Sequence, residues 1–307
     1  MKRVRPQSSK TTVKMGILEN RASLVSNLVP QNLADVASRL VEAIAINSVW
    51  EKKRGNRTVV VKRRNLHSEQ LAELTNLYFR VANIPIRFWS KLDEWRRWEV
   101  DCFEMLNGDC FQAHASGRRR VAEKLPGESL WEHLNRGTLT EQILRSAALE
   151  FRRAHQFWSD EFRGRWSHGD ASITNVIYDP KTNRARFIDF EIYHDKSLPA
   201  AARQADDLLV FLLDLVGTVP TRQWLPFATT FLEAYGDREV IAQLRSRLDL
   251  PGGLAWIWWG VRTNFTNPAK VKGRLNNLSR AILKLNLTKS PPPPARAANV
   301  VLQSTAR

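Results

Sequence analysis

The sequence predicts an α+β fold, with strands concentrated in the first half of the chain and helices in the second. Short β-branched or apolar runs lie between positions 57 and 125, whereas amphipathic helical periodicity dominates from position 203 onward. At 307 residues the chain exceeds the usual size of a single core. We therefore expect one large domain in two lobes, or two smaller domains.

The first part of the chain is predicted to combine strands with three helices. An amphipathic helix is expected from Leu33 to Ile46, and the β-branched run from Arg57 to Arg63 is typical of a strand. Ser68 is expected to cap a helix with the sequence SEQLAELTNLYFRV. The remaining elements are a helix over DEWRRWEVDCFEML and a hairpin with strands near Cys110 to Ala115 and Arg120 to Leu125, joined at Ser116-Gly117.

The second part is predicted to be mostly helical. Thr138 and Glu141 have the spacing of a capping box, which predicts a helix running to about Phe157. A short hairpin follows, with strands at Val176 to Tyr178 and Ala185 to Ile188 around the turn DPKTNR. The later helices are expected in ADDLLVFLLDLV, WLPFATTFLEAY, DREVIAQLRSRL, GLAWIWWGVRTNF and LNNLSRAILKL.

Composition excludes several classes of protein. No apolar run approaches the roughly 18 residues of a membrane span, so the sequence predicts a soluble protein. The basic, polar N-terminus has no apolar stretch behind it, which argues against a secretory signal. Cys102 and Cys110 are the only cysteines, too few for a disulfide framework, and a reducing cytoplasm fits best.

The net charge of +16 is spread unevenly along the chain. Residues 1–14 carry five basic side chains and residues 288–307 carry three, with no acidic ones, which leaves +8 for the remainder. Such a balance favours an anionic partner, whether nucleotide, nucleic acid, phosphorylated glycolipid or membrane surface. A solvated basic surface explains the charge equally well.

Chemistry-bearing side chains are concentrated in WSHGDASITNVIYD, residues 166–179. Asp170 and Asn175 precede one predicted strand, and Asp189 follows the next, so we expect all three at one end of the hairpin. Mg²⁺ prefers oxygen ligands and takes one or two from the protein. Asn175 and Asp189 would supply them, while Asp170 would accept a proton from an attacking hydroxyl.

The pattern H-G-D-x-x-x-x-N, followed after a hairpin by I-D-F-E, resembles the catalytic loop and metal-binding segment of the protein-kinase-like superfamily. It is more similar to the branch of aminoglycoside and choline phosphotransferases and lipopolysaccharide core kinases than to protein kinases, which usually have H-R-D and D-F-G. The resemblance covers roughly residues 57–235. It implies a two-lobed fold with a small β-rich N-lobe at 21–125 and a larger helical C-lobe at 126–287. Residues 1–20 lack periodicity and residues 288–307 contain a proline run, so both tails are expected to be disordered.

The resemblance further implies an ATP-dependent phosphotransferase that binds ATP and Mg²⁺ between the lobes. Asp170 would orient and deprotonate an acceptor hydroxyl, and Asn175 with Asp189 would hold the metal. His168 belongs to the same catalytic loop and is expected to order it by hydrogen bonding, because Asp170 has the better position for the base.

A lysine on a strand must hold the nucleotide phosphates, and a glutamate on a helix must orient that lysine. Lys62, at the end of a β-branched run, is the expected lysine, although a solvated edge lysine is the alternative. Glu99 is the expected partner and Glu104 its competitor. An additional helix separates Lys62 from Glu99 in the sequence.

The segment AEKLPGESL, residues 122–130, resembles the hinge between the lobes. Main-chain groups around Glu123 to Leu125 would bind adenine there, although a plain strand-to-helix turn at Pro126-Gly127 explains the segment equally well. The segment SVWEKKRGNRT, in contrast, departs from the family because it lacks the G-x-G-x-x-G loop and contains Gly55 alone.

Two further segments match the family. Asp206 or Asp207 is expected to brace the catalytic loop by accepting backbone hydrogen bonds, or to be an ordinary carboxylate near a helix N-terminus. His155 matches a recurrent family histidine, and a packed surface histidine is the alternative.

The acceptor is the least determined part of the prediction. The basic body and tails favour a glycolipid such as the lipopolysaccharide core, modified in the cytoplasm with peripheral contact to the anionic inner face of the membrane. A soluble amino sugar, a choline-like alcohol or a protein hydroxyl stays open, and the sequence does not indicate the oligomeric state. The rival hypotheses are a non-catalytic kinase-like scaffold, a protein serine/threonine kinase and, on charge alone, a nucleic-acid-binding protein, which is not favoured.

The cluster of Trp256, Trp258 and Trp259 has helical spacing. It is expected to pack a helix into the second lobe, and a platform for a sugar or lipid is the alternative.

Overall fold

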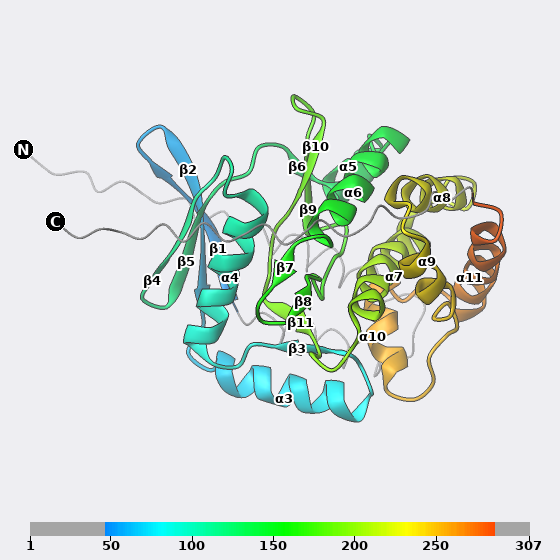
Figure 1. Cartoon of the computed structure of the whole chain (residues 1–307), viewed down its shortest axis with the longest axis horizontal. Coiled ribbons are helices and arrows are strands. Elements are labelled where there is room, and N and C mark those ends of the chain that lie inside the picture. The colour runs from blue at the N-terminus through cyan, green and yellow to red at the C-terminus, as the bar shows by residue number, and fades with distance from the viewer. Residues whose placement is uncertain (1–46, 286–307) are drawn as a thin grey trace, which may run out of the picture.

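The computed structural model describes residues 47–285. The predicted helix from Leu33 to Ile46 and both predicted tails lie outside the described residues. Within the described range, helices combine with antiparallel strands, in agreement with the α+β class (Figure 1).

The main sheet has four antiparallel strands in the order β1-β2-β5-β4. The predicted strand β2 (Arg57–Arg64) and the predicted hairpin of β4 (Ala113–Ser116) and β5 (Arg119–Glu123) are confirmed. The edge strand β1 (Asn47–Arg54) was not predicted. Its second half is charged and exposed, a composition that protects an edge strand from further pairing but hides the strand in the sequence.

Two helices follow the first hairpin, as predicted. Helix α4 (Leu92–Asn107) packs against β4 and β5, and α3 (Ser68–Val81) lies apart from the main sheet along the lower edge of Figure 1. The prediction of Ser68 as the N-cap is wrong by one residue. His67 occupies that position, and the Ser68 hydroxyl donates to the carbonyl of Asn65 at 2.8 Å.

Short strands connect distant parts of the chain. The pair of β3 (Ile86–Phe88) and β11 (Ile192–His194) joins residues more than 100 positions apart and was not predicted. The predicted hairpin is present as β9 (Val176–Asp179) and β10 (Arg184–Phe187). The remaining short strands are β6 (Glu128–Ser129), which pairs with β9, and the pair β7 (Trp158–Ser159) and β8 (Gly164–Arg165).

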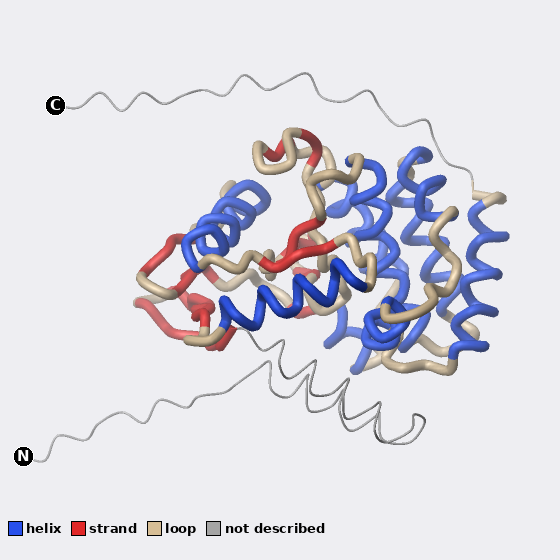
Figure 2. Tube along the Cα trace, turned by 90° about the horizontal axis from the view of Figure 1, so that it is seen from below, coloured by secondary structure: helices blue, strands red, loops and turns tan. Residues whose placement is uncertain are grey.

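Helices dominate the rest of the described chain and gather at the end opposite the main sheet (Figure 2). The most buried is α7 (Ala200–Thr218), which has core residues on almost every side. The others are α5 (Leu130–Asn135), α6 (Glu141–Ala154), α8 (Trp224–Tyr235), α9 (Arg238–Arg245), α10 (Ala255–Arg262) and α11 (Pro268–Ile282).

The predicted capping box at Thr138 and Glu141 is wrong. The N-cap of α6 is Thr140, whose hydroxyl accepts from the amide of Ile143, and the helix ends at Ala154. The Thr138 hydroxyl instead contacts His133 at the end of the preceding helix. A capping box does occur one helix earlier, between Ser129 and Glu132.

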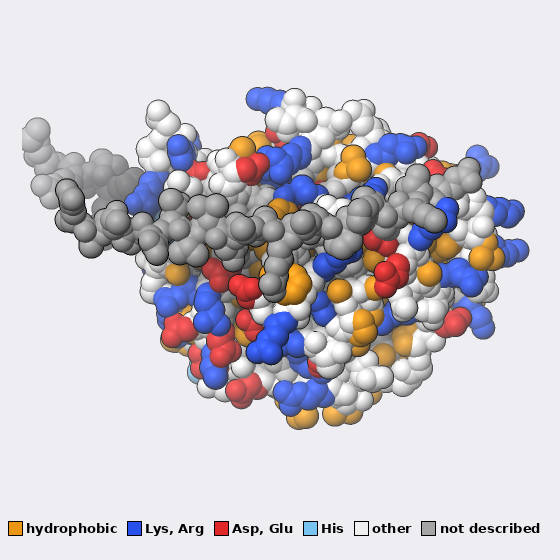
Figure 3. Space-filling model, in the orientation of Figure 1, with side chains coloured by type: hydrophobic (Ala, Val, Ile, Leu, Met, Phe, Trp, Pro, Cys, Tyr) orange, Lys and Arg blue, Asp and Glu red, His pale blue; other side chains and the backbone are white. Residues whose placement is uncertain are grey.

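Basic side chains are scattered over the face shown in Figure 3 and alternate with acidic ones. This distribution resembles the solvated basic surface that the composition allowed as an alternative. None of the helices within residues 47–285 is both long and apolar enough to cross a membrane.

Candidate active site

The Lys62 ammonium lies at the centre of a buried cluster of charges. Lys62 Nζ donates to Glu99, to Asp189 at 2.5 Å, and lies 3.0 Å from a carboxylate oxygen of Glu191. The side chain is only 4% exposed and comes from the inner strand β2, so the alternative of a solvated edge lysine is wrong. Glu104, the competitor of Glu99, is exposed on α4.

Electrostatics keep Lys62 protonated. Burial lowers the pKa of the Lys62 ammonium, but the carboxylates of Asp189, Glu191 and Glu99 outweigh burial and raise that pKa well above its ordinary value. A second cation approaches from the neighbouring strand, because Arg120 Nε lies 3.7 Å from Glu99. The cluster therefore contains a permanent positive charge surrounded by carboxylates.

The chain after β10 brings two of these carboxylates to Lys62. Asp189 has a φ of +69°, a left-handed conformation that aspartate tolerates better than most residues. Glu191 directly precedes β11, which pairs with β3 next to α4. The β3–β11 pairing therefore ties the I-D-F-E segment to the same part of the molecule as Glu99.

The His168-Gly169-Asp170 loop is held from below by α7. Asp207 accepts from the amides of His168 at 2.7 Å and Gly169 at 2.8 Å, and Asp214, two turns later on the same helix face, accepts from the amide of Ile173. Asp206 instead contacts His194 and Arg247. Of the two carboxylates considered from the sequence, Asp207 is the one that bonds to the loop.

Asp207 is a fully buried anion with several partners. Burial raises the pKa of Asp207, but nearby His194 and the hydrogen bond with His155 outweigh burial, so the pKa falls to about 2. His155 is buried, which rules out a surface histidine, and its other ring nitrogen contacts the hydroxyl of Tyr235 at 2.9 Å. The loop thus rests on a permanently charged support.

Gly169 is required where it stands. Its φ is +85°, and an added Cβ would lie 3.1 Å from the carbonyl oxygen of Ile192 and from the Cα of Tyr193. The loop therefore lies directly against β11. A larger residue between His168 and Asp170 would separate the loop from the strand that follows Glu191.

Both ring nitrogens of His168 contact the backbone. Nε2 lies 3.1 Å from the carbonyl oxygen of Ile188, and Nδ1 accepts from the amide of Asp170 at 3.2 Å. Burial lowers the pKa of His168, which favours the neutral ring that these contacts need. The geometry suits a residue that orders the loop.

Hydrogen bonds of Asn175 connect the segments that contain Asp170 and Asp189. The side-chain Nδ2 of Asn175 donates to the backbone carbonyl of Asp170 at 2.9 Å, and the backbone carbonyl of Asn175 accepts from the amide of Ile188, next to Asp189. Their side chains have different partners, since Asp189 contacts Lys62 whereas Asp170 forms an ion pair with Arg262.

The oxygen donors at the cluster fit a hard divalent cation. Single ligand atoms of Glu99, Asp189 and Glu191 lie within 4.8 Å of one another. Carboxylate oxygens are the ligands that Mg²⁺ prefers, and the Lys62 ammonium offsets only part of their charge. Asn175, whose amide nitrogen is already bonded to Asp170, would offer its amide oxygen from the neighbouring loop.

The predicted hinge, residues 122–130, begins in the last two residues of β5 and extends through β6. The carboxylate of Glu123 contacts Arg57 and the amide of Gln112, while the amides of Glu123 and Lys124 donate to backbone carbonyls. Leu125 is buried in the main core. This segment joins the main sheet to β6.

Three residues of the site were not assigned from the sequence: Glu191, Asp214 and Arg262. Glu191 had a usable signal, because it follows Asp189 by two positions within the quoted I-D-F-E motif. Asp214 lies seven residues after Asp207 on a predicted helix, a spacing that places both on one face. Arg262 had no such signal, since it lies 92 positions from Asp170.

The tryptophan cluster on α10 is only partly buried. Trp258 packs edge-on against Phe79 of α3, with ring centroids 5.1 Å apart, and its ring also faces Arg262. The expectation that the cluster packs a helix is therefore correct, but part of the packing is against α3.

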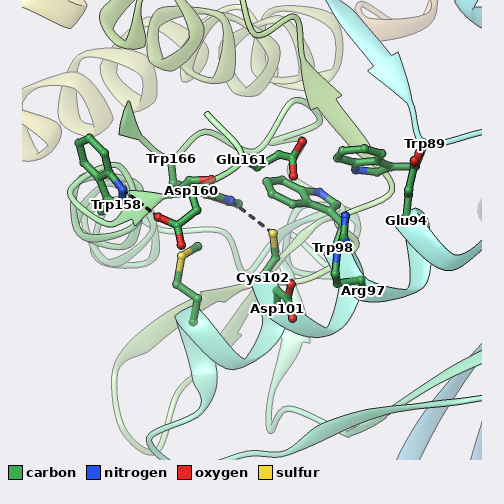
Figure 4. Close-up of a pocket in the computed structure, with 12 residues that line it drawn as sticks. Trp89, Glu94, Arg97, Trp98, Asp101, Cys102, Trp158, Asp160, Glu161 and Trp166 are labelled. Atoms are coloured by element: carbon green, nitrogen blue, oxygen red, sulfur yellow. Dashed lines mark hydrogen bonds between the residues drawn. The ribbon is translucent and has the colours of Figure 1, made fainter. Parts of the chain in front are cut away.

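A pocket of about 380 Å³ lies on another face of α4, against β7 (Figure 4). Four tryptophans and four carboxylates are among its lining residues: Trp89, Trp98, Trp158, Trp166, Glu94, Asp101, Asp160 and Glu161. The Trp166 indole donates to the Cys102 sulfur at 3.4 Å. None of the predicted site residues lines this pocket.

Comparison with known proteins finds similarity to solved structures alone. No protein-family model matches the chain, and no curated protein matches it. Among solved structures, the bifunctional kinase-methyltransferase WbdD is similar over 73% of this chain, with a TM-score of 0.34 and 18% sequence identity. The chain spans about half the length of that structure, 48%.

Proposed function

We propose that the protein is an ATP-dependent phosphotransferase with a two-lobed, kinase-like fold and an alcohol as acceptor. The observation that carries this proposal is the buried contact of Lys62 with both Glu99 and Asp189. Strand β2, helix α4 and the loop between β10 and β11 supply these residues. A lysine oriented by a helical glutamate, beside a metal-binding carboxylate, is the arrangement that phosphoryl transfer requires of a kinase.

Lys62 is proposed to hold the α- and β-phosphates of ATP. Its raised pKa keeps the ammonium charged, and its three N–H donors can exchange carboxylate oxygens for phosphate oxygens. Glu99, fully buried on α4, would keep the ammonium in place during this exchange. ATP would lie between the main sheet and the helical part, with adenine near Glu123 to Leu125.

Asp189 and Asn175 are proposed to hold Mg²⁺, and Glu191 is placed to assist them. When bound, the ion would neutralise charge on the phosphate oxygens. The oxygen donors around Lys62 support this assignment, because single ligand atoms of three carboxylates lie within 4.8 Å of one another there.

Asp170 is proposed to orient the acceptor and take its proton. The acceptor oxygen forms a bond to the γ-phosphorus while the bond from that phosphorus to the β,γ-bridging oxygen breaks. The acceptor proton passes to Asp170, and ADP leaves with the electron pair of the broken bond. The Asp207 support would keep the loop in position, so that catalysis rests on positioning and charge.

The acceptor class favoured by the basic surface is an anionic glycolipid such as the lipopolysaccharide core. The work would then take place in the cytoplasm, with peripheral contact to the inner face of the membrane. Soluble amino sugars, choline-like alcohols and protein hydroxyls are the alternatives that an acceptor screen separates.

The test is a transfer screen with ATP labelled at the γ-phosphate and Mg²⁺, across lipopolysaccharide core, aminoglycosides, choline and a generic protein acceptor. We expect label on one acceptor class and a loss of roughly 10²- to 10⁴-fold in the Asp170→Asn variant. Asp249→Asn, at an exposed position, is the matched control and should keep full activity. ATP binding without transfer to any acceptor would favour the non-catalytic scaffold instead.

A further inference from the structure

Arg262 reaches the candidate base from a helix that no site prediction included. Its Nη1 donates to the Asp170 carboxylate, although the two residues lie 92 positions apart. The Arg262 side chain is 7% exposed and that of Asp170 is 22% exposed. A guanidinium is therefore buried at the place where the accepting hydroxyl would bind.

Part of the Arg262 guanidinium lacks hydrogen-bond acceptors among the described residues. Within residues 47–285, its Nε and Nη2 are buried and have no hydrogen-bond partner. Arginine has five N–H donors in a rigid plane, and buried donors without an acceptor are costly. A ligand with two oxygen atoms on one centre would satisfy these donors.

The surroundings of Arg262 fix its orientation. The guanidinium carbon lies 4.6 Å from the ring centroid of Trp258, which itself packs against Phe79 of α3. On the other side, α10 approaches α7 so closely that a Cβ on Gly217 would lie 2.4 Å from the carbonyl oxygen of Thr263. The arginine is thus held between two packed contacts and pre-organised.

We propose that Arg262 binds an anionic group of the acceptor, a phosphate or a carboxylate, close to the accepting hydroxyl. This inference rests on the proposed function and narrows its acceptor class to alcohols that carry such a group. The planar fork of arginine matches two oxygens of either anion, which a lysine does not. Trp258 supports the guanidinium by cation–π contact, and Asp170 offsets its charge until the acceptor binds.

The position of Arg262 favours the acceptor over the nucleotide. Lys62, the proposed phosphate ligand of ATP, belongs to β2 and bonds to Asp189, whereas Arg262 belongs to α10 and bonds to Asp170. The two cations therefore serve different carboxylates from different elements. Contact of Arg262 with the transferred phosphoryl group instead is an outcome that the experiment can detect.

The binding experiment needs no knowledge of the natural acceptor. Thermal unfolding of the full chain is followed with a saturating non-hydrolysable ATP analogue and Mg²⁺, while inorganic phosphate, glucose 6-phosphate or glucose is added. We expect phosphate and glucose 6-phosphate to stabilise the wild type with glucose inactive, and Arg262→Gln to weaken their apparent affinity roughly 10- to 100-fold. Arg262→Lys should restore part of the affinity, because it keeps the charge and loses the fork.

Arg280→Gln is the matched control, since Arg280 is an exposed arginine on α11 and general attraction of anions to a basic protein would change equally in both variants. Equal stabilisation of Arg262→Gln and wild type by phosphate would overturn the proposal, as would no stabilisation of the wild type. If Arg262→Gln does not fold, the comparison of Arg262→Lys with the wild type decides in the same way.

A kinetic measurement separates the acceptor from the transferred group. With an anionic and a neutral acceptor of the same sugar, Arg262→Gln should raise KM for the anionic acceptor alone. An equal fall in kcat for both acceptors would place Arg262 at the transferred phosphoryl group and contradict the proposal. If Mg·ATP raises the Tm but phosphate binding does not depend on Arg262, the kinase assignment stands and the anion site is wrong. If phosphate binding depends on Arg262 but Mg·ATP does not raise the Tm, the anion site stands and the kinase assignment is wrong.

Discussion

At Lys62 one ammonium faces three carboxylates, whereas at Asp170 one carboxylate faces one guanidinium. The Lys62 cluster is closed to solvent, while Asp170 is open enough to meet a second molecule. At the Lys62 cluster the carboxylates share Lys62 and the more distant Arg120, whereas Asp170 pairs with Arg262. Under the proposed function, this difference fits a metal ion at the Lys62 end and the acceptor at the Asp170 end.

The largest expected effect tests this difference in charge. Lys62→Met should lower the free energy of unfolding by about 3 to 5 kcal/mol without Mg²⁺, because three carboxylates lose their common partner. Added Mg²⁺ should restore part of the loss. Urea unfolding with and without Mg²⁺ measures both values.

Arg262→Gln is the comparison variant for that experiment. It should lower the free energy of unfolding by less than Lys62→Met does, because the exposed part of the Asp170 carboxylate can be hydrated. Mg²⁺ should have little effect on this variant. Equal losses in the two variants, or no rescue of Lys62→Met by Mg²⁺, would contradict the contrast between the two ends.

A second prediction concerns the support beneath Asp170. Asp207→Asn should lower the free energy of unfolding at pH 7 by about 2 kcal/mol, since the pKa of Asp207 falls from 3.8 to about 2 on folding. A folded pKa below the unfolded value stabilises the fold above the unfolded pKa. The contribution is lost as pH falls from about 4 to about 2.

The neighbouring Asp206→Asn variant is the control, because Asp206 bonds to His194 rather than to the loop amides. It should lose less stability than Asp207→Asn. Chemical unfolding over that acid range compares each variant with the wild type, and an unchanged acid profile in Asp207→Asn would refute the support role.

The smallest expected effect separates close packing from backbone conformation. Gly169→Ala and Gly55→Ala both place alanine at a positive φ, but a Cβ meets other atoms only at Gly169. In each variant the left-handed backbone conformation should lower the free energy of unfolding by about 1 to 2 kcal/mol, and Gly169→Ala should lower it somewhat more. Only Gly169→Ala should also reduce phosphate transfer. The transfer rates of the two variants are measured at equal concentrations of folded protein.

Local patterns predicted the elements of the fold better than their connections. The long helices α4, α7 and α8 and the strand β2 follow from periodicity and β-branched composition. The pairing of β3 with β11 could not be predicted, because three-residue strands have no periodicity and their partners lie far apart. Strand β1 was not predicted for a different reason, because the charged composition of its second half is typical of a loop.

The Lys62 end and the Asp170 end of the site also differ in how far the sequence predicted their contacts. The Lys62–Glu99 contact was expected from sequence motifs, and the structure contains it, although the role of each residue in binding ATP stays a prediction. Arg262 follows from no motif, because its contact with Asp170 depends on how α10 packs between α3 and α7. Sequence motifs therefore described the proposed nucleotide end and left the proposed acceptor end open.

The most direct test of the central claim is thermal unfolding of the full chain with Mg·ATP, compared with the Asp189→Ala variant. A ligand that binds the folded state must stabilise it, by about 2.7 kcal/mol at a concentration 100 times Kd. We predict a rise in Tm for the wild type that requires both ATP and Mg²⁺ and is absent from Asp189→Ala. No rise in the wild type, or an equal rise in the variant, would contradict the assignment of a kinase site to Lys62 and Asp189.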